Sequence, residues 1–489
     1  MTDLHLHFDR SAGRLAGQIA AELRAAIRSG RLVANTRLPS SRDLARDLGV
    51  SRGVVVTAYE QLIAEGFLTA RRGDGTRVAP LATPDRPASR ARLGDEPDES
   101  VQYDLRPGVP DLSAFPRERW LTATRHVLRT LPNSALGYPD PAGVPALRTE
   151  LAGYLGRVRA ANVPPERIII TNGVAQGIAI LVRLLVADGA GALAVEDPTS
   201  SRQLPLLRAA GVDIVPVPVD GAGVDVAALA RTGARAVLLT PAHHYPTGVV
   251  LSPPRRSALV RWARDVDGLV IEDDYDAEFR YDREPVGCLQ GIEPDRVVLA
   301  GSVSKSLAPG LRLGWLAAPG ELAERVRDYR ASTDLGGQVI EQHVLAHLIS
   351  SGAYDRQLRV MRRRYRARRD ALAAAVRTHL PGATVRGVSA GLHLYVELPS
   401  GRSEEDVVRA AARRGVAVEG AAELWSTPPP RPALVLGYAR LSTPRLTEAA
   451  ALIGAATKDL PKAPFPCGDL VLRVDTKCMI TQRIRPAGD

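Results

Sequence analysis

The chain has 489 residues, of which 45% are hydrophobic, and a formal net charge of +10 at pH 7. This length allows two or three globular domains, while the absence of a long apolar run and of a secretory signal argues against a membrane or secreted protein. The three cysteines lack metal-ligand spacing, so we expect a cytoplasmic protein with no metal site, whose positive charge is compatible with nucleic-acid binding.

The beginning of the chain is predicted to form three short helices. Apolar residues spaced by four predict an amphipathic helix over residues 15–29. Ser40 or Ser41 is a candidate N-cap for a second helix over residues 42–48, and Ser51 is the candidate N-cap of the third. Two short helices joined by a tight turn are typical of a helix-turn-helix motif.

The third helix is followed by a predicted hairpin. Two strand-like runs, at residues 67–71 and 76–79, flank a glycine-containing turn, which is the pattern of a β-hairpin or wing. Val55, Tyr59 and Leu62 are expected to form the inner face of the third helix. The segment up to the end of this hairpin holds twelve arginines and eight acidic residues, which gives it a net charge of about +4.

The run from Leu38 to Ala79 closely resembles the winged helix of GntR-family repressors. The resemblance implies that double-stranded DNA is the partner, because in that family the starts of the second and third helices and the wing contact DNA. Arginine can recognise guanine in the major groove. A winged helix that contacts only proteins is the alternative. The DNA-binding residues that the resemblance implies are Arg42, Arg52, Thr57, Arg71, Gly73, Gly75 and Thr76.

Residues 80–102 are expected to form a flexible linker between two domains. The first 21 of these residues contain four prolines, mixed charge and few apolar side chains, so they cannot bury a core. We therefore expect a DNA-binding domain at residues 1–79 and a large domain at residues 103–459. The last segment, residues 460–489, changes in composition and is expected to be poorly ordered.

Apolar strand-like runs alternate with helical stretches across the large domain. Such alternation is typical of a mostly parallel sheet with flanking helices, so the expected fold class is α/β. Ligands in such folds bind at the carboxyl ends of the strands. The predicted strands are residues 168–171, 193–196, 213–217, 236–240, 269–272 and 297–300.

Lys305 is the only lysine in the first 457 residues of an arginine-rich chain. Arginine keeps its proton near neutral pH, whereas the amine of a lysine can be deprotonated and attack a carbonyl to form a Schiff base. Ser302 lies just before Lys305, and Arg312 lies seven residues after it. A lysine, a hydroxyl and an arginine suit a ligand with an aldehyde and a phosphate, and pyridoxal 5′-phosphate (PLP) is such a ligand.

The segment around Lys305 resembles the active-site lysine segment of fold-type I PLP proteins, the aspartate aminotransferase class. The resemblance implies that Lys305 is the catalytic lysine that binds PLP and that Ser302 and Arg312 bind its phosphate. By the same pattern, Asp273 pairs with the pyridine nitrogen and Tyr275 lies near the O3′ oxygen of the ring. An acidic, solvated turn is the alternative for Asp273.

Three further places match this class, in part with differences. The turn at Gly173, Val174 and Ala175 matches the phosphate cup, where a helix N-terminus offers free amides and a positive dipole end. Tyr138 matches a tyrosine that reaches the phosphate in a neighbouring subunit, which implies a homodimer with shared sites. Tyr245 is a further cofactor-binding candidate, although aminotransferases have an asparagine at this position.

Two arginines are candidates to bind an effector. Arg202 and Arg440 could each hold a carboxylate through paired hydrogen bonds, and for each the alternative is an ordinary surface arginine. Ser200 stands near the place where relatives have an aromatic residue stacked on the cofactor ring. Cofactor affinity or effector choice is therefore expected to differ from those of the relatives.

A GntR-type winged helix fused to an aminotransferase-like domain is the architecture of the MocR/GabR regulators, which the chain resembles over about residues 10–455. The resemblance implies a head-to-tail homodimer that regulates transcription and senses PLP or an amino compound through Schiff-base exchange at Lys305. Known branches control vitamin B6 synthesis, γ-aminobutyrate use and taurine use. The vitamin B6 branch is favoured, because a sensor of free PLP needs little effector chemistry.

Two alternatives remain open for the large domain. The first is a working PLP-dependent aminotransferase that carries a DNA-binding appendage, since all the cofactor residues are present. Sustained turnover with an amino donor would favour this enzyme, whereas slow half-reactions alone would favour the sensor. The second is a regulator that no longer binds PLP, and the retained Lys305 argues against it.

Overall fold

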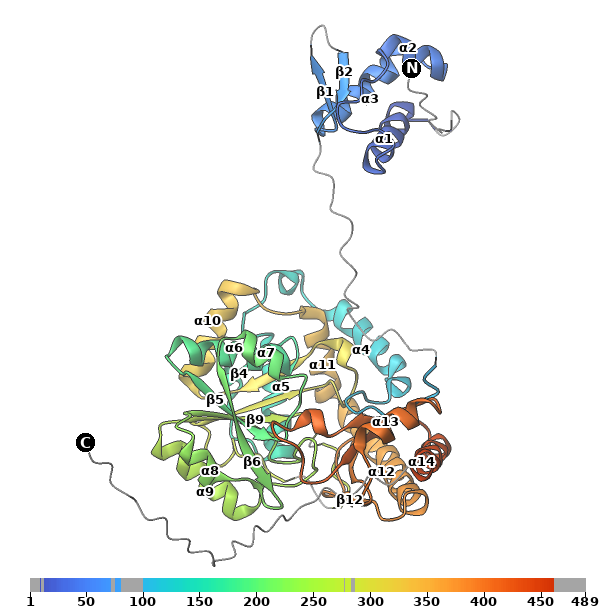
Figure 1. The fold of residues 1–489 in the computed structure, drawn as a ribbon. Helices are drawn as coiled ribbons and strands as arrows, with labels where there is room; N and C mark the ends of the chain where they lie inside the picture. Colours follow the sequence, from blue (N-terminus) through green and yellow to red (C-terminus); the bar gives the residue numbers. More distant parts are fainter. Residues whose placement is uncertain are drawn as a thin grey trace, which may run out of the picture. The chain divides into compact units, whose positions relative to one another are not determined.

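The chain divides into two compact units, Met1–Glu96 and Pro97–Asp489, each described by itself (Figure 1). The computed structural model describes residue 9 and residues 13–71, 75–80, 100–276, 278–282 and 286–460. Most of the expected linker and nearly all of the expected tail therefore lie outside the described residues. Within these ranges, no helix has both the length and the apolar character needed to cross a membrane.

Three helices and one hairpin form the first unit, as the sequence predicts. They are α1 (Leu15–Arg28), α2 (Ser41–Leu48), α3 (Arg52–Ala64), β1 (Leu68–Arg71) and β2 (Gly75–Val78). Ile19 of α1 packs in one apolar core with Val55 and Leu62 of α3. The two strands pair antiparallel, with Leu68 opposite Val78, so the hairpin closes the end of the motif.

The helix caps of the first unit follow the prediction only in part. Ser40 is the N-cap of α2, and its hydroxyl oxygen accepts a hydrogen bond from the backbone amide of Asp43 at 3.2 Å. Gly49 ends α2 with a φ of 61°, in the left-handed region that favours glycine. Ser51 is the N-cap residue of α3, as predicted, but its side chain makes no capping hydrogen bond.

An eight-stranded mixed sheet forms the centre of the second unit, in the order β4-β11-β10-β9-β8-β5-β6-β7. All six predicted strands are present. β11 was not predicted, and it lies between β4 and β10 and runs antiparallel to both. The five neighbouring strands β10, β9, β8, β5 and β6 pair in parallel, so their carboxyl ends meet at one edge of the sheet. The strands are β4 (Ile168–Thr171), β5 (Ala192–Asp197), β6 (Asp213–Asp220), β7 (Gly223–Val224), β8 (Ala236–Leu239), β9 (Leu269–Asp274), β10 (Val297–Ser302) and β11 (Gly314–Ala317).

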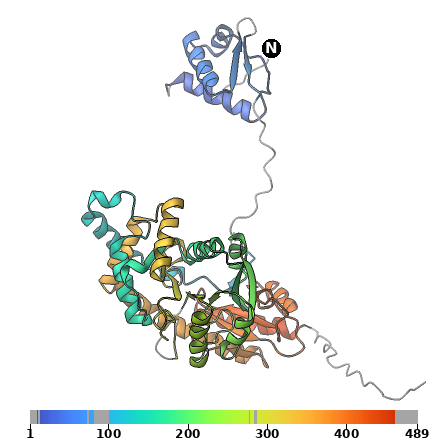
Figure 2. The same ribbon diagram turned by 90° about the vertical axis from the view of Figure 1, so that its left-hand side faces the viewer.

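Helices cover both faces of this sheet, as Figures 1 and 2 show. Successive residues of a strand point to opposite faces, and β10 follows this rule. Val298 and Ala300 pack with α6, α7 and α10, Leu299 packs with α5 and α11, and Val297 packs with α8 and α9. The helices are α4 (Arg117–Thr130), α5 (Pro145–Arg159), α6 (Val174–Ala187), α7 (Leu204–Ala209), α8 (Val226–Arg231), α9 (Pro253–Asp265), α10 (Gly320–Thr333) and α11 (Val339–Ser350).

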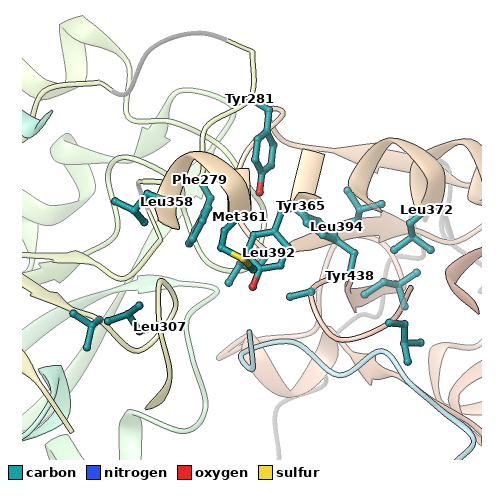
Figure 3. Packing of buried hydrophobic residues seen from close by; sticks show 14 of the residues in the cluster. Phe279, Tyr281, Leu307, Leu358, Met361, Tyr365, Leu372, Leu392, Leu394 and Tyr438 are labelled. Atoms are coloured by element: carbon teal, nitrogen blue, oxygen red, sulfur yellow. The ribbon is translucent and has the colours of Figure 1, made fainter. Parts of the chain in front are cut away.

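The long helix α12 (Ala353–His379) leads into a smaller antiparallel sheet of order β12-β13-β16-β15. Figure 3 shows Met361 and Tyr365 of α12 beside Leu392, Leu394 and Tyr438 in one apolar core. That core joins the large sheet to the small one. The other elements are β3 (Tyr103–Asp104), β12 (Thr384–Arg386), β13 (His393–Glu397), α13 (Glu404–Ala412), β14 (Val416–Ala417), β15 (Glu419–Gly420), β16 (Ala433–Gly437) and α14 (Thr443–Lys458).

Candidate cofactor and DNA-binding sites

A cavity of about 180 Å³ lies at the carboxyl edge of the large sheet. The ends of β9 and β10 bring Asp273 and Lys305 to it, as expected for neighbouring parallel strands. His393, at the start of β13 in the small sheet, lines the cavity as well, so both sheets of the second unit contribute to it. The sequence-predicted residues that line the cavity are Lys305, Asp273, Tyr275, Tyr245 and Arg202, and Ser200 lines it with them.

Lys305 presents a partly buried amine to this cavity. Its Nζ atom donates a hydrogen bond to the backbone carbonyl of Gly108. Burial lowers the pKa of the amine, and the nearby carboxylates of Asp276 and Asp273 act in the opposite direction. A lowered pKa increases the fraction of unprotonated amine at neutral pH, which is the form that attacks an aldehyde.

Asp273 has one carboxylate oxygen without a partner. Its Oδ2 atom accepts a hydrogen bond from Nε2 of Gln203 at 2.9 Å. Its Oδ1 atom is buried and has no hydrogen-bond partner among the described residues. Burial raises the pKa of Asp273 to about 6, and the hydrogen bond from Gln203 opposes this rise. A protonated ring nitrogen would satisfy the free oxygen, so the residue fits PLP.

Tyr275 belongs to a buried network of polar side chains. Its hydroxyl donates to the backbone carbonyl of His243 at 3.1 Å and lies 3.2 Å from Nδ1 of the same histidine. That nitrogen also lies 3.0 Å from Oδ2 of Asp276. Burial raises the pKa of Tyr275 well above its usual value, so the phenol stays protonated and remains a hydrogen-bond donor.

The predicted phosphate-binding residues come together at the start of α6. Gly173 is the N-cap of this helix, with a φ of 82°. This φ favours glycine, and a Cβ atom added at Gly173 would lie 2.9 Å from Nη2 of Arg312 and displace that guanidinium. Ser302 pairs with Gly314, and a Cβ at Gly314 would lie 2.8 Å from the backbone of Gly173. The first amides of α6, at Val174 and Ala175, add further donors.

The phosphate-binding candidates at the start of α6 do not line the cavity, and neither do Tyr138 and Arg440. Tyr138 is 90% exposed, which is compatible with a contact to another subunit. Arg440 forms an ion pair with Asp104, and Asp104 also binds Arg106 through two hydrogen bonds of 3.0 and 2.8 Å. An effector carboxylate would therefore compete with Asp104 for Arg440.

Gln203 and His393 are among the cavity residues that were not predicted from the sequence. Gln203 supports Asp273, and His393 lines the cavity from β13. Burial lowers the pKa of His393 to about 4, so its imidazole is neutral at pH 7, and Nε2 lies 2.9 Å from the backbone carbonyl of Pro246. His393 lies far from Lys305 in the sequence, and no motif in the sequence predicts that the two residues line one cavity.

The predicted DNA-binding side chains of the first unit are mostly exposed. Arg52, at the start of α3, donates from Nε to Oγ of Ser41 at 3.3 Å, so it links the two helices of the motif. Thr57 donates its hydroxyl to the backbone carbonyl of Gly53 at 3.0 Å. The residues Arg42, Arg52, Thr57, Arg71 and Gly75 are exposed, Thr76 is half-buried, and Gly73 lies outside the described residues.

Known families match both units. Residues 15–78 match the family described as bacterial regulatory proteins, gntR family, and residues 104–450 match aminotransferase class I and II. Among solved structures, the α-aminoadipate aminotransferase LysN from Thermus thermophilus is similar with a TM-score of 0.66 and 25% identity. The match covers 74% of this chain and 92% of LysN, which was solved with N-(5′-phosphopyridoxyl)-L-leucine.

Similar regulators combine both domains. The probable rhizopine catabolism regulatory protein MocR of Rhizobium meliloti is 32% identical over 445 residues, covering 87% of this chain and 90% of that protein. The pyridoxine biosynthesis transcriptional regulator PdxR of Corynebacterium glutamicum is 35% identical over 420 residues, covering 85% and 90%. The chain therefore belongs to the MocR/GabR subfamily of GntR-type transcription regulators, in which a DNA-binding winged helix is joined to a PLP-binding, aminotransferase-like domain.

Proposed function

We propose that this regulator senses PLP, or an amino compound that reacts at PLP, through Lys305. The observation that supports the proposal is one cavity that holds the partly buried amine of Lys305 and the unpartnered oxygen of Asp273. When bound, PLP supplies an aldehyde for an amine and a ring that withdraws electrons. Occupation of this cavity would then change how strongly the winged helix binds DNA.

Each residue of the site has a proposed task. Lys305 provides the amine that holds the cofactor, and Asp273 accepts a hydrogen bond from the ring nitrogen and keeps that nitrogen protonated. Tyr275 keeps its proton and orients the ring through its hydroxyl. The remaining proposed cofactor contacts are Ser302, Arg312, Tyr138, Tyr245 and the backbone amides at Gly173, Val174 and Ala175.

The proposed effector is PLP itself, which would place the protein in control of vitamin B6 synthesis. One relative, PdxR, is named for pyridoxine biosynthesis and shares 35% identity. Ser200, rather than an aromatic residue, lines the cavity, so an aromatic ring stacked on the cofactor is not supplied from this position. An amino compound held by Arg202, or by Arg440 after release from Asp104, is the alternative effector.

A second candidate function is catalysis of amino-group transfer. It is supported by the presence of Lys305 and Asp273 in one cavity, as in an aminotransferase. Repeated turnover of an amino donor with a 2-oxo acid would establish this activity. A single half-reaction per site, without turnover, would assign the chemistry to sensing.

We also propose a head-to-tail homodimer in the cytoplasm. Five large hydrophobic side chains between positions 112 and 138 are exposed in the single chain. They are Leu112, Leu121, Leu128, Leu136 and Tyr138. Exposed apolar residues concentrated in one stretch are typical of a contact surface. A second copy of the chain that covers them would bring its own Tyr138 to the neighbouring site.

Binding to the DNA upstream of the protein's own gene tests the proposed function. We expect Arg52→Ala to weaken binding strongly and Arg31→Ala, an exposed arginine outside the motif, to leave it near the wild-type value. Added PLP should change the affinity of the wild-type protein but not that of Lys305→Ala. An equal response to PLP in both proteins would contradict sensing through Lys305.

A further inference from the structure

Helix α12 has one apolar face and one face rich in arginine. Its 27 residues include nine arginines and two aspartates. Figure 3 shows the apolar face, where Leu358, Met361, Tyr365 and Leu372 lie in the core of the second unit. The orientation of the helix is fixed by this packing, so the residues on its other side face outward.

Four arginines form a row on the outward side: Arg356, Arg359, Arg363 and Arg366. They are spaced by three, four and three residues, which places them on one face of the helix. All four are exposed, and within the part of the chain that the structure describes none of them forms an ion pair. We refer to these four residues as the α12 arginine row.

The acidic residues of α12 are bound to arginines outside the row. Asp355 pairs with Arg157 at 2.9 Å, and Asp370 pairs with Arg369 at 3.1 Å. The charge of the row is therefore not neutralised by its own helix. The arginine-rich composition of the chain does not by itself explain this, because α10 has as many acidic residues, Glu321, Glu324 and Asp328, as arginines.

The row is as long as a few phosphate steps of duplex DNA. The ten residue-to-residue steps from Arg356 to Arg366 span about 15 Å at about 1.5 Å per step. One DNA strand presents a phosphate about every 3.4 Å along its axis, so about four phosphates face this length. A cavity of about 370 Å³ beside Arg359 is lined by carboxylates as well as arginines, Glu278 and Asp355 among them, so the proposed phosphate contacts are those of the exposed row and not of this cavity.

We propose that the α12 arginine row binds the phosphate backbone of the DNA to which the winged helix is bound. The contact is independent of base sequence, because only phosphates are recognised. It rests on the chain being a DNA-binding regulator. Since both units belong to one chain, DNA held by the winged helix is present near the second unit at a high effective concentration, so even a weak contact is occupied.

The salt dependence of DNA binding by the full chain tests this proposal. The probe is a labelled duplex of mixed sequence, about six helical turns long, and affinities are measured by fluorescence anisotropy at several salt concentrations. The variant Arg359→Gln/Arg363→Gln/Arg366→Gln removes three charges, and glutamine has nearly the helix propensity of arginine. The slope of log K against log salt is expected to become shallower by roughly 2.7, or about 0.9 for each lost phosphate contact.

A charge-matched control separates a local contact from the overall charge. Arg208, Arg231 and Arg261 are exposed, lie on α7, α8 and α9, and form no ion pair among the described residues. The variant with all three changed to glutamine should keep a slope within about one unit of wild type. An equal change in both variants, or no change in the α12 variant, would overturn the proposal.

Two further measurements make the outcome decisive. If the α12 variant sediments as a smaller species than wild type, the row contributes to a subunit contact, and the proposal is overturned. Arg52→Ala is measured on the same duplex and on the DNA upstream of the gene. Loss of specific binding in Arg52→Ala together with a normal salt slope in the α12 variant would keep the winged-helix function and reject the arginine row.

Discussion

Burial changes the acid–base properties of the two central residues of the cavity in opposite directions. It lowers the pKa of the Lys305 amine and raises the pKa of the Asp273 carboxyl to about 6. Both shifts have the same cause, because removing water disfavours whichever form is charged. The protein without cofactor thus keeps a reactive amine and a carboxyl that stays protonated at higher pH than usual.

Asp273→Asn is predicted to change how stability depends on pH. Between about pH 4 and 6 the folded protein keeps a proton on Asp273 that the unfolded chain, with a carboxyl pKa of 3.8, has released. The free energy of unfolding therefore falls as the pH rises through this window. The raised pKa lowers the free energy of unfolding by on the order of 3 kcal/mol across this window. Asp273→Asn has no carboxyl group at this position, so its stability should not show this fall.

Urea unfolding of the cofactor-free protein measures this effect. All four tryptophans lie in the second unit, at residues 120, 262, 315 and 425, so their fluorescence follows that unit alone. Relative to wild type, Asp273→Asn should gain stability between about pH 4 and 7. Glu196→Gln is a comparison variant that should show its own gain between about pH 4.5 and 7, because burial raises the pKa of Glu196 from 4.5 to about 7. A stability difference for Asp273→Asn that does not vary with pH would rule out the shift.

At the scale of elements, the short turns between strands and helices determine where side chains meet. The turn from β4 to α6 favours glycine at position 173, because φ there is 82°, and the guanidinium of Arg312 packs beside it. β11 returns from the Lys305 segment and pairs with β4, which brings Gly314 against this turn. One hairpin thus carries the lysine and places the arginine at the helix N-terminus.

The helix caps of the first unit give a prediction at this scale. Ser40→Ala removes the hydrogen bond to the amide of Asp43 and should destabilise α2 by about 1 kcal/mol. Ser51→Ala should have a much smaller effect, because that side chain makes no capping hydrogen bond. Hydrogen exchange of the α2 and α3 amides in the full chain measures both. Equal protection of α2 in Ser40→Ala and wild type would show that the cap contributes nothing.

The sequence predicts the order of elements better than the contacts of the site. Strands such as residues 168–171 are continuous apolar runs, and their pattern is visible locally. β11 is a four-residue strand whose place between β4 and β10 depends on partners far away in the chain. Gln203 and His393 reach the cavity only through the fold, and Arg440 meets Asp104 across 336 positions of sequence. The roles of Asp273 and Tyr275 at the cofactor were predicted from the resemblance to a family, because the spacing of these residues alone does not indicate them.

At the scale of the whole molecule, the exposed apolar stretch predicts the oligomeric state. Leu136 is 57% exposed and lies two residues before Tyr138. If this stretch forms the proposed dimer contact, Leu136→Glu should shift the protein towards monomer and weaken PLP binding. Ile292→Glu is the control, because Ile292 is 55% exposed but lies elsewhere. Sedimentation velocity checks both. A Leu136→Glu variant that sediments like wild type would exclude this stretch from the dimer contact.

The central claim is that Lys305 anchors PLP in this regulator. An absorbance titration with PLP of the wild type, Lys305→Ala and Lys458→Ala tests it most directly, because Lys458 is the other lysine among the described residues. We predict a new band near the edge of the visible range in the wild type and in Lys458→Ala, and none in Lys305→Ala. A band of equal strength in Lys305→Ala, or no band in the wild type, would contradict the claim.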